Sequence, residues 1–196
     1  MSWSKETRFF IALTVDEKYC SMLKELQFDL MDDLEYLPHS VNWTKKKRLH
    51  LTLFFLGHQS PETLCGFIEA MTKIQREFFQ SIFQQPVLFA SNQVQLFPTE
   101  KPTVIALTGP YPKPLNHLRD TVANCLKETH IKPDLSHEVR GFLPHVTIGT
   151  LREATDLKNQ PVDITICFTE MVLFKSEMIE PRSVTHTPLC SWSLVE

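Results

Sequence analysis

Hydrophobic and polar positions along the chain follow two periods. Segments of alternating type, rich in aromatic and β-branched residues, predict strands over residues 8–15, 42–44, 49–56, 86–97, 103–108, 163–174 and 184–194. Segments whose apolar residues recur every three or four positions predict helices that begin after Asp16, at Pro61 and near Leu115. Ser60 is the expected cap of the second helix, since a serine hydroxyl accepts hydrogen bonds from free backbone amides. This mixture predicts an α+β fold.

One of these strands contains a motif that recurs later in the chain. The tetrad His50-Leu51-Thr52-Leu53 returns, with conservative changes, as His145-Val146-Thr147-Ile148. Because side chains alternate between the two faces of a strand, the histidine and the threonine of each copy share one face. Each strand is therefore expected to present an imidazole and a hydroxyl to a cleft, with its apolar residues buried behind them.

The sequence before each tetrad repeats as well. Phe10-Ile11-Ala12-Leu13 precedes His50 by 40 residues, and Val104-Ile105-Ala106-Leu107 precedes His145 by 41 residues. Chance similarity between short apolar runs is the alternative, but the matching offsets favour a true repeat. We therefore expect residues 1–196 to form a single bilobal domain, whose halves face each other across a pseudo-twofold axis and bring both histidines into one cleft.

Two histidines that converge on one phosphate form an acid–base pair. Neutral imidazole accepts a proton and imidazolium donates one near neutral pH, so the rate should follow a bell-shaped pH profile. The hydroxyls of Thr52 and Thr147 can donate hydrogen bonds to the non-bridging oxygens. This chemistry requires no metal and no cofactor. A single His-x-Thr in a strand usually has no function; the other six histidines, His186 among them, lack such a context, and we expect most of them at the surface.

Charge limits the partners. The net charge is −3, whereas proteins that grip long nucleic acids are usually basic. If the protein handles RNA, we therefore expect it to recognise an RNA end or a small piece. The basic run 45–48 directly precedes His50. It is either a solvated loop or a group of cations that attracts phosphate to the cleft mouth.

The remaining composition indicates a protein of a reducing compartment. The five cysteines are scattered and form no CxxC pair, which favours free thiols. We find no signal-peptide pattern and no apolar run long enough to span a membrane. We therefore expect a cytoplasmic monomer without a membrane partner.

The motifs and their flanking residues resemble the two-histidine phosphoesterase superfamily. Within it, they are similar to the bacterial and archaeal RNA 2′,3′-cyclic phosphodiesterases, also called the 2′-5′ RNA ligase family. The resemblance covers nearly the whole chain. The segments that carry it include Arg8-Phe9-Phe10-Ile11-Ala12-Leu13, Asn42-Trp43-Thr44, Leu49-His50-Leu51-Thr52-Leu53-Phe54-Phe55-Leu56-Gly57 and Phe142-Leu143-Pro144-His145-Val146-Thr147-Ile148.

The resemblance implies a bilobal fold, with antiparallel sheets around a central cleft and helices on the outside. It implies hydrolysis of a terminal 2′,3′-cyclic phosphate to a 2′-phosphomonoester, and a reversible 2′,5′ ligation of RNA ends by the same chemistry. His50 would be the proton donor to the leaving 3′ oxygen, and His145 the proton acceptor that activates water. Thr52 and Thr147 would hold the phosphate.

The chain departs from the family pattern near the motifs. Thr150 stands where members often carry an arginine, and Arg152 is the candidate to replace it in substrate binding. Ala106 replaces a tryptophan of the central strand. Phe9, Trp43 and Phe54 are candidates to stack on a terminal base, with core packing as their alternative role.

Two other functions stay open. One is a phosphodiesterase that acts on 2′,5′-linked oligonucleotides or small cyclic nucleotides. The other is a non-catalytic module that binds RNA ends. The presence of two complete motifs counts against a pure binding module, which has no need for two titrating groups.

Overall fold

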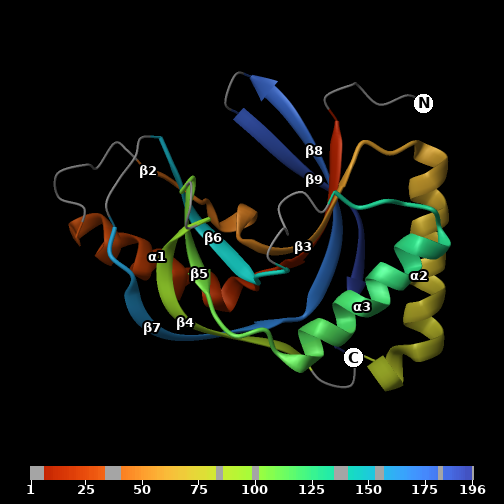
Figure 1. Ribbon diagram of the computed structural model, residues 1–196, viewed down its shortest axis with the longest axis horizontal. Coiled ribbons are helices and arrows are strands. Elements are labelled where there is room, and N and C mark those ends of the chain that lie inside the picture. The colour runs from red at the N-terminus through yellow and green to blue at the C-terminus, as the bar shows by residue number, and fades with distance from the viewer. Residues whose placement is uncertain are drawn as a thin grey trace.

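The structure is a computed structural model that describes residues 7–33, 41–82, 86–98, 102–134, 141–152, 157–180 and 183–195. Within these ranges, three α-helices and a 3-10 helix accompany the strands (Figure 1). In chain order the elements are β1 (Arg8–Thr14), α1 (Glu17–Asp33), β2 (Val41–Trp43), η1 (Lys46–Arg48), β3 (His50–Gly57), α2 (Pro61–Ile82), β4 (Val87–Phe97), β5 (Val104–Thr108), α3 (Lys113–Glu128), β6 (His145–Leu151), β7 (Gln160–Phe168), β8 (Glu170–Glu180) and β9 (Ser183–Ser193).

All nine of these strands belong to one antiparallel sheet. Its order is β7-β4-β5-β6-β3-β1-β8-β9, and β2 pairs with β6 outside this path. The two motif strands, β3 and β6, are neighbours at the centre and share one recorded pair, Leu51 with Val146. The predicted α+β class with antiparallel pairing and outer helices is confirmed, although the strands form one continuous sheet and not separate ones.

The two halves of the sheet have matching registers. Pairing of β1 on β3 is repeated by pairing of β5 on β6. The equivalent pairs are Thr14–His50 and Thr108–His145, Leu13–Leu51 and Leu107–Val146, and Ala12–Thr52 and Ala106–Thr147. The predicted internal repeat is therefore present in the backbone pairing, with its axis between β3 and β6.

Each motif strand also contains a β-bulge directly after its threonine. Leu53 in β3 and Ile148 in β6 are the extra residues, because the register shifts at these points. A bulge leaves backbone groups outside the ladder. Gln27 of α1 donates a hydrogen bond to the Ile148 carbonyl at 2.8 Å, and Arg119 of α3 donates one to the Leu53 carbonyl at 3.4 Å. The helix of the first half, α1, thus donates to the bulge carbonyl of the second half, and α3 of the second half donates to that of the first.

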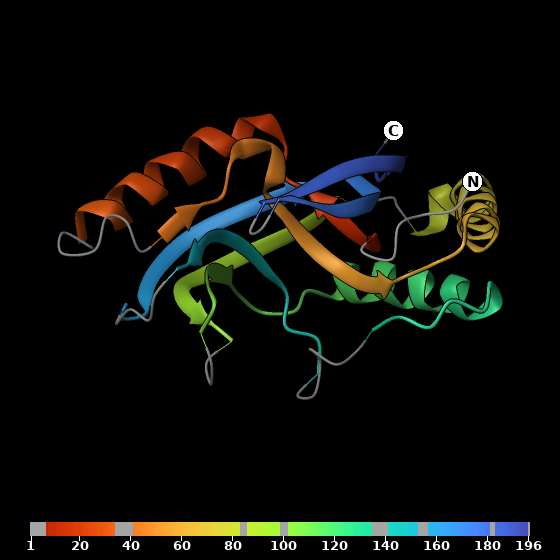
Figure 2. The ribbon, with the colours of Figure 1, turned by 90° about the horizontal axis from the view of Figure 1, so that it is seen from above.

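The helices stand apart at the two ends of the sheet. Figures 1 and 2 show α1 at one end and α2 with α3 at the other. The main core lies between the sheet and these helices; its largest fully buried side chains include Phe9, Phe67, Phe89, Phe168 and Trp192. A smaller apolar cluster lies on the opposite face of β1 and β8 and consists of Phe10, Ala12, Val172 and Phe174.

The structure corrects one predicted strand. Residues 163–174 form parts of two strands, β7 and β8, which separate at Thr169. The polar residues Thr169 and Glu170 interrupt the apolar alternation there, but no glycine or proline marks the break. The Thr169 hydroxyl donates a hydrogen bond to the Asp16 carboxylate at 2.8 Å, while β7 pairs with β4 and β8 with β1. The other predicted elements begin within two residues of their predicted starts, and the Ser60 hydroxyl caps α2 through the Thr63 amide.

Replacing Gln27 with leucine should destabilise the fold. The side chain is 9% exposed and donates to the carbonyls of Thr44 and Ile148. Leucine leaves the Thr44 carbonyl without this donor, which we expect to cost about 1–3 kcal/mol in the free energy of unfolding measured in urea. Glu25→Gln, an exposed change on the same helix, is the matched control. Equal stability of the two variants would refute the role of Gln27.

Candidate functional site

The polar residues of both motifs lie on one face of the central strand pair, which we call the histidine face. His50 and Thr52 come from β3, and His145 and Thr147 from β6; all are half-buried. The residues between them, including Leu51, are fully buried on the other face. Because Leu51 pairs with Val146 in an antiparallel ladder, the histidine of each strand lies opposite the threonine of the other strand. The two histidines are therefore diagonal to each other.

Both imidazoles are fixed in the same way. His50 Nδ1 lies 2.8 Å from the Arg48 carbonyl oxygen, and His145 Nδ1 lies 2.9 Å from the Leu143 carbonyl oxygen. A carbonyl can only accept, so Nδ1 carries the hydrogen in each ring. The second nitrogen, Nε2, is then a base in the neutral ring and an acid in the charged ring. No hydrogen bond to either threonine hydroxyl is recorded within the described part of the chain, so both hydroxyls can serve a ligand.

The surroundings favour the neutral form of both rings. The pKa of His50 is lowered to about 4, chiefly by burial and also by nearby His186, His145 and Arg48, while the hydrogen bond to the Arg48 carbonyl acts in the opposite direction. Burial also lowers the pKa of His145 below its usual value. In the absence of ligand, both imidazoles are therefore neutral at pH 7.

Different aromatic neighbours surround the two histidines. His145 packs against Phe97 of β4, with ring centroids 4.3 Å apart. His50 packs against Phe10 of β1 at 5.2 Å and lies edge-on to His186 of β9 at 5.9 Å. Most of the six other histidines were expected at the surface, but His186 is half-buried beside His50. Only the pairing of β9 with β8 brings it there, so no local sequence signal could have identified it.

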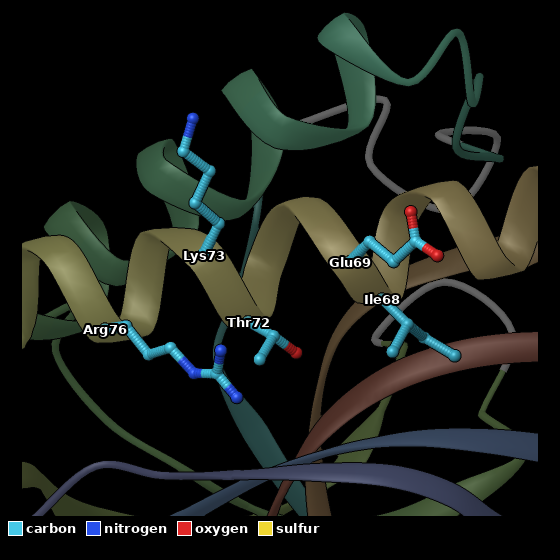
Figure 3. Close-up of a pocket in the computed structure, with 5 residues that line it drawn as sticks. All are labelled: Ile68, Glu69, Thr72, Lys73 and Arg76. Atoms are coloured by element: carbon cyan, nitrogen blue, oxygen red, sulfur yellow. The ribbon is translucent and has the colours of Figure 1, made fainter.

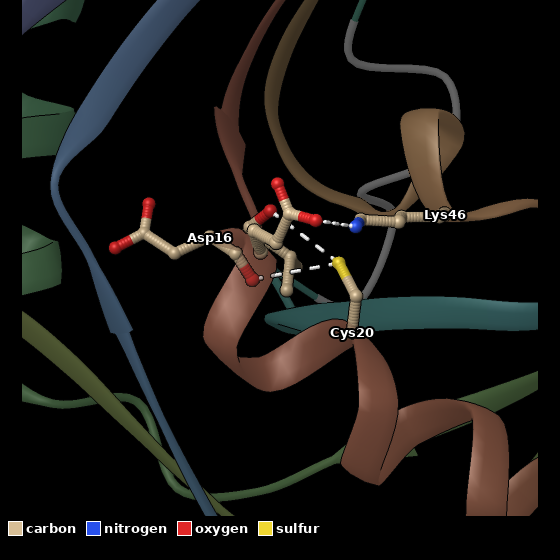
Figure 4. A network of polar contacts seen from close by, with 5 residues as sticks. Asp16, Cys20 and Lys46 are labelled. Atoms are coloured by element: carbon tan, nitrogen blue, oxygen red, sulfur yellow. Dashed lines mark hydrogen bonds and ion pairs between the residues drawn. The ribbon is translucent and has the colours of Figure 1, made fainter.

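A pocket of about 240 Å³ opens beside His50. Its lining includes Phe10, Thr14, Lys47, Arg48, His50 and His186. Lys46 also lines it and forms an ion pair with Glu17 at the start of α1 (Figure 4). Three of the four basic residues in the run 45–48 thus lie at the site, which favours the phosphate-attracting interpretation of that run over a solvated loop.

The predicted stacking residues lie on the wrong side of the sheet. Phe9 is 1% exposed and belongs to the main core, so its ring is inaccessible to a base; its neighbour Phe10 faces His50 instead. Trp43 packs against the core, and its ring would lie 3.3 Å from a Cβ atom at Gly149. Phe54 is also buried, under the Arg119 guanidinium. All three residues therefore have the alternative role, which is core packing.

The bulge in β6 changes which later residues reach the histidine face. Thr150 pairs with Val104, just as Thr147 pairs with Ala106, so the two threonines share a face although they are three residues apart. Thr150, in the place where an arginine was expected, is exposed at this position. Arg152 follows the end of β6 and is also exposed. Its role in substrate binding stays a prediction.

A larger depression of about 400 Å³ lies elsewhere, along α2 (Figure 3). Its described lining residues come from this one helix: Ile68, Glu69, Thr72, Lys73 and Arg76. None of these five is a histidine, and none lines the pocket beside His50. A surface formed by a single helix offers no converging groups for chemistry, so the histidine face is the better candidate for an active site.

Two further findings concern the described residues as a whole. No three or more histidine, cysteine, aspartate or glutamate side chains in these ranges come together in a way that would hold a metal ion. None of the helices in these ranges has the length and hydrophobicity needed to cross a membrane.

A pseudo-symmetric antiparallel sheet with one His-x-Thr strand from each half defines a two-histidine phosphoesterase fold. Residues 9–166 match the model of the 2′-5′ RNA ligase superfamily, and the chain belongs to that superfamily.

Solved structures share this fold over nearly the whole chain. TT0787 of Thermus thermophilus superposes with a TM-score of 0.73 at 20% identity, over 95% of this chain and 97% of that one. A protein described as a phosphoesterase gives 0.71 at 19% identity, over 97% and 99%. E. coli LigT in its apo form gives 0.71 at 18% identity, over 97% and 98%. At these identities the likeness concerns the fold. No curated protein matches the sequence.

Histidine titration by NMR should detect the lowered pKa values. We expect His50 and His186 of the unliganded protein to titrate near pH 4 and His145 below 6.5, because burial disfavours their charged forms. The same residues in urea should titrate near the unperturbed value of about 6.5. Added phosphate should raise the pKa of His50, since an anion stabilises the imidazolium. A pKa at or above 6.5 for His50 without ligand would contradict the described burial.

Proposed function

We propose that this protein hydrolyses the terminal 2′,3′-cyclic phosphate of RNA to a 2′-phosphomonoester, without a metal. The observation that carries the proposal is the pair of equivalent imidazoles on the histidine face, each fixed through Nδ1 with Nε2 left for chemistry. Membership of the 2′-5′ RNA ligase superfamily supports a phosphodiester as the substrate. E. coli LigT, which shares the fold, has been crystallised with phosphate and with 3′-AMP, in keeping with a nucleotide phosphate as ligand.

In this mechanism, the hydroxyls of Thr52 and Thr147 donate hydrogen bonds to the non-bridging oxygens of the cyclic phosphate. His145 Nε2 removes a proton from a water molecule, whose oxygen attacks phosphorus. The bond between phosphorus and the 3′ oxygen breaks, and His50 Nε2 donates a proton to that oxygen. The product keeps its phosphate on the 2′ oxygen. A ribose 5′-hydroxyl in place of water would give 2′,5′ ligation by the same steps.

The substrate itself supplies the condition that His50 needs. As proton donor His50 must be charged, but in the empty site its pKa is about 4. A cyclic phosphate carries a negative charge, and an anion close to an imidazole raises its pKa. Binding of the substrate therefore favours the charged form of His50 that the mechanism requires. Arg152, exposed beyond β6, is the candidate to contact the RNA backbone.

Removal of either histidine should abolish most activity. The substrate is a short RNA that ends in a 2′,3′-cyclic phosphate, and the buffer contains a chelator. His50→Ala and His145→Ala should each lower kcat by roughly 10²–10⁴-fold, the usual contribution of an acid–base group. His58→Ala, an exposed change after β3, is the matched control and should retain full activity. Unchanged rates in both variants, or loss of activity on chelation, would refute the proposal.

The pH dependence of kcat/KM should be bell-shaped, with its maximum below pH 6.5. The reaction needs one charged and one neutral imidazole. Activity therefore falls at low pH when both are charged and at higher pH when both are neutral. Both pKa values lie below 6.5 in the free protein, and that of His50 is about 4. A maximum at pH 7.5 or above would show that the free histidines are not held neutral as described.

A further inference from the structure

The pocket beside His50 is more basic than the rest of the histidine face. Of its three lining cations, Lys46 is paired with Glu17. Lys47 and Arg48 have no ion-pair partner recorded among the described residues. Their charges therefore remain available to an anionic ligand that enters the pocket.

An acidic group also lies near this pocket. Glu170 of β8 accepts a hydrogen bond from the hydroxyl of Thr14, one of the lining residues, at 3.2 Å. It is not itself a lining residue, whereas Lys47 and Arg48 are. The charges at the pocket surface are therefore cationic.

His186 adds a hydrogen-bond donor to the same pocket. Its Nδ1 atom is buried and has no hydrogen-bond partner. Its Nε2 atom is not in this situation. The ring packs edge-on against Phe10, with centroids 4.9 Å apart, and lines the pocket. Because an unpaired buried donor is costly, the neutral ring is best accommodated with its hydrogen on Nε2. That N–H can donate to an oxygen in the pocket.

We infer that this pocket binds a second phosphate of the substrate, the one on the 5′ oxygen of the nucleotide that bears the cyclic phosphate, which in RNA is the internucleotide phosphodiester. The inference rests on the proposed function, because it places the reacting phosphate against His50, which also lines this pocket. Lys47 and Arg48 supply the charge, and His186 supplies a directed hydrogen bond. The next phosphate of the strand lies one ribose away from the reacting one.

The shape of the pocket suits a phosphate better than a base. Its volume of about 240 Å³ is below the range of roughly 300–1,000 Å³ that is usual for drug-sized ligands. Two of its lining residues, Phe10 and Phe174, already stack on one another, with ring centroids 5.1 Å apart. Both rings are buried, so they offer no free face for a base.

Among the described residues, the surroundings of His145 lack the basic neighbours that line the pocket beside His50. Leu143, which stands where Arg48 does relative to its histidine, is apolar and exposed. The pairing of β7 with β4 ends at Val94, so no outer strand reaches the level of Phe97. The strand β9, in contrast, continues past Phe174 and carries His186. The RNA chain is therefore held from the His50 side.

Calorimetric binding of unreactive nucleotides tests this subsite. The probes are adenosine 3′-phosphate, adenosine 3′,5′-bisphosphate and a dinucleotide with a 3′-phosphate. We expect at least one of the two probes with a second phosphate to bind roughly tenfold or more tightly than adenosine 3′-phosphate, and this preference should weaken as salt is added. Preference for the bisphosphate alone shows that the subsite requires a 5′-phosphomonoester, and preference for the dinucleotide shows that it accepts the internucleotide phosphodiester.

Variants identify the residues. Arg48→Gln, Lys47→Gln and His186→Phe should each reduce the preference several-fold, whereas Arg48→Lys should retain most of it. Lys45→Gln is the matched control, since Lys45 belongs to the same basic run but does not line the pocket and makes no side-chain cap. Equal affinity of the wild-type protein for all three probes, or an equal loss of preference in Lys45→Gln, would overturn the inference.

A separate assay distinguishes this inference from the proposed function. Uridine 2′,3′-cyclic phosphate has no second phosphate, so its hydrolysis reports the histidine pair alone. Turnover without any preference among the binding probes refutes only the subsite. A clear preference without turnover refutes only the proposed hydrolysis.

Discussion

One backbone pair, Leu51 with Val146, joins the two motif strands β3 and β6 at the centre of this sheet. Every polar group of the site is placed relative to it, because His50 and Thr52 flank one member and the second motif flanks the other. Both members are fully buried. Their apolar packing fixes which face the neighbouring residues take, since a one-residue slip of either strand would turn the histidine and threonine of that strand into the core. The chemistry therefore depends on an interaction that involves no catalytic group.

The scaffold is nearly symmetric, but the surroundings of the two imidazoles are not. Identical carbonyl contacts orient both rings, so orientation does not distinguish them. The difference comes from their neighbours: β4 places Phe97 against His145, whereas β9 places His186 near His50 and η1 places cations there. Two titratable groups in unlike environments are the usual basis for separate acid and base roles. The internal repeat provides two equivalent histidines, and their different neighbours place these histidines in different environments.

Local patterns predicted the parts of the structure that local forces determine. The strands, the helix starts and the repeat are encoded by apolar periodicity and caps, and the pairing confirmed them. Other features depend on distant pairing. The break at Thr169 has no glycine or proline to mark it, the bulge at Ile148 brings Thr150 onto the histidine face, and His186 reaches His50 only because β9 pairs with β8. The choice between Phe9 and Phe10 likewise depended on which face of β1 the core covers.

The exchange of helices between the halves has a consequence for synthesis of the chain. Gln27 lies 121 residues before the carbonyl that it satisfies in β6, and Arg119 lies 66 residues after its carbonyl in β3. An N-terminal half that leaves the ribosome first therefore cannot complete its own packing. It must wait for β6, and its helix α1 meanwhile exposes an apolar face. Contacts of such long range slow folding, and the two halves, although they repeat one pattern, acquire stability only as one cooperative unit.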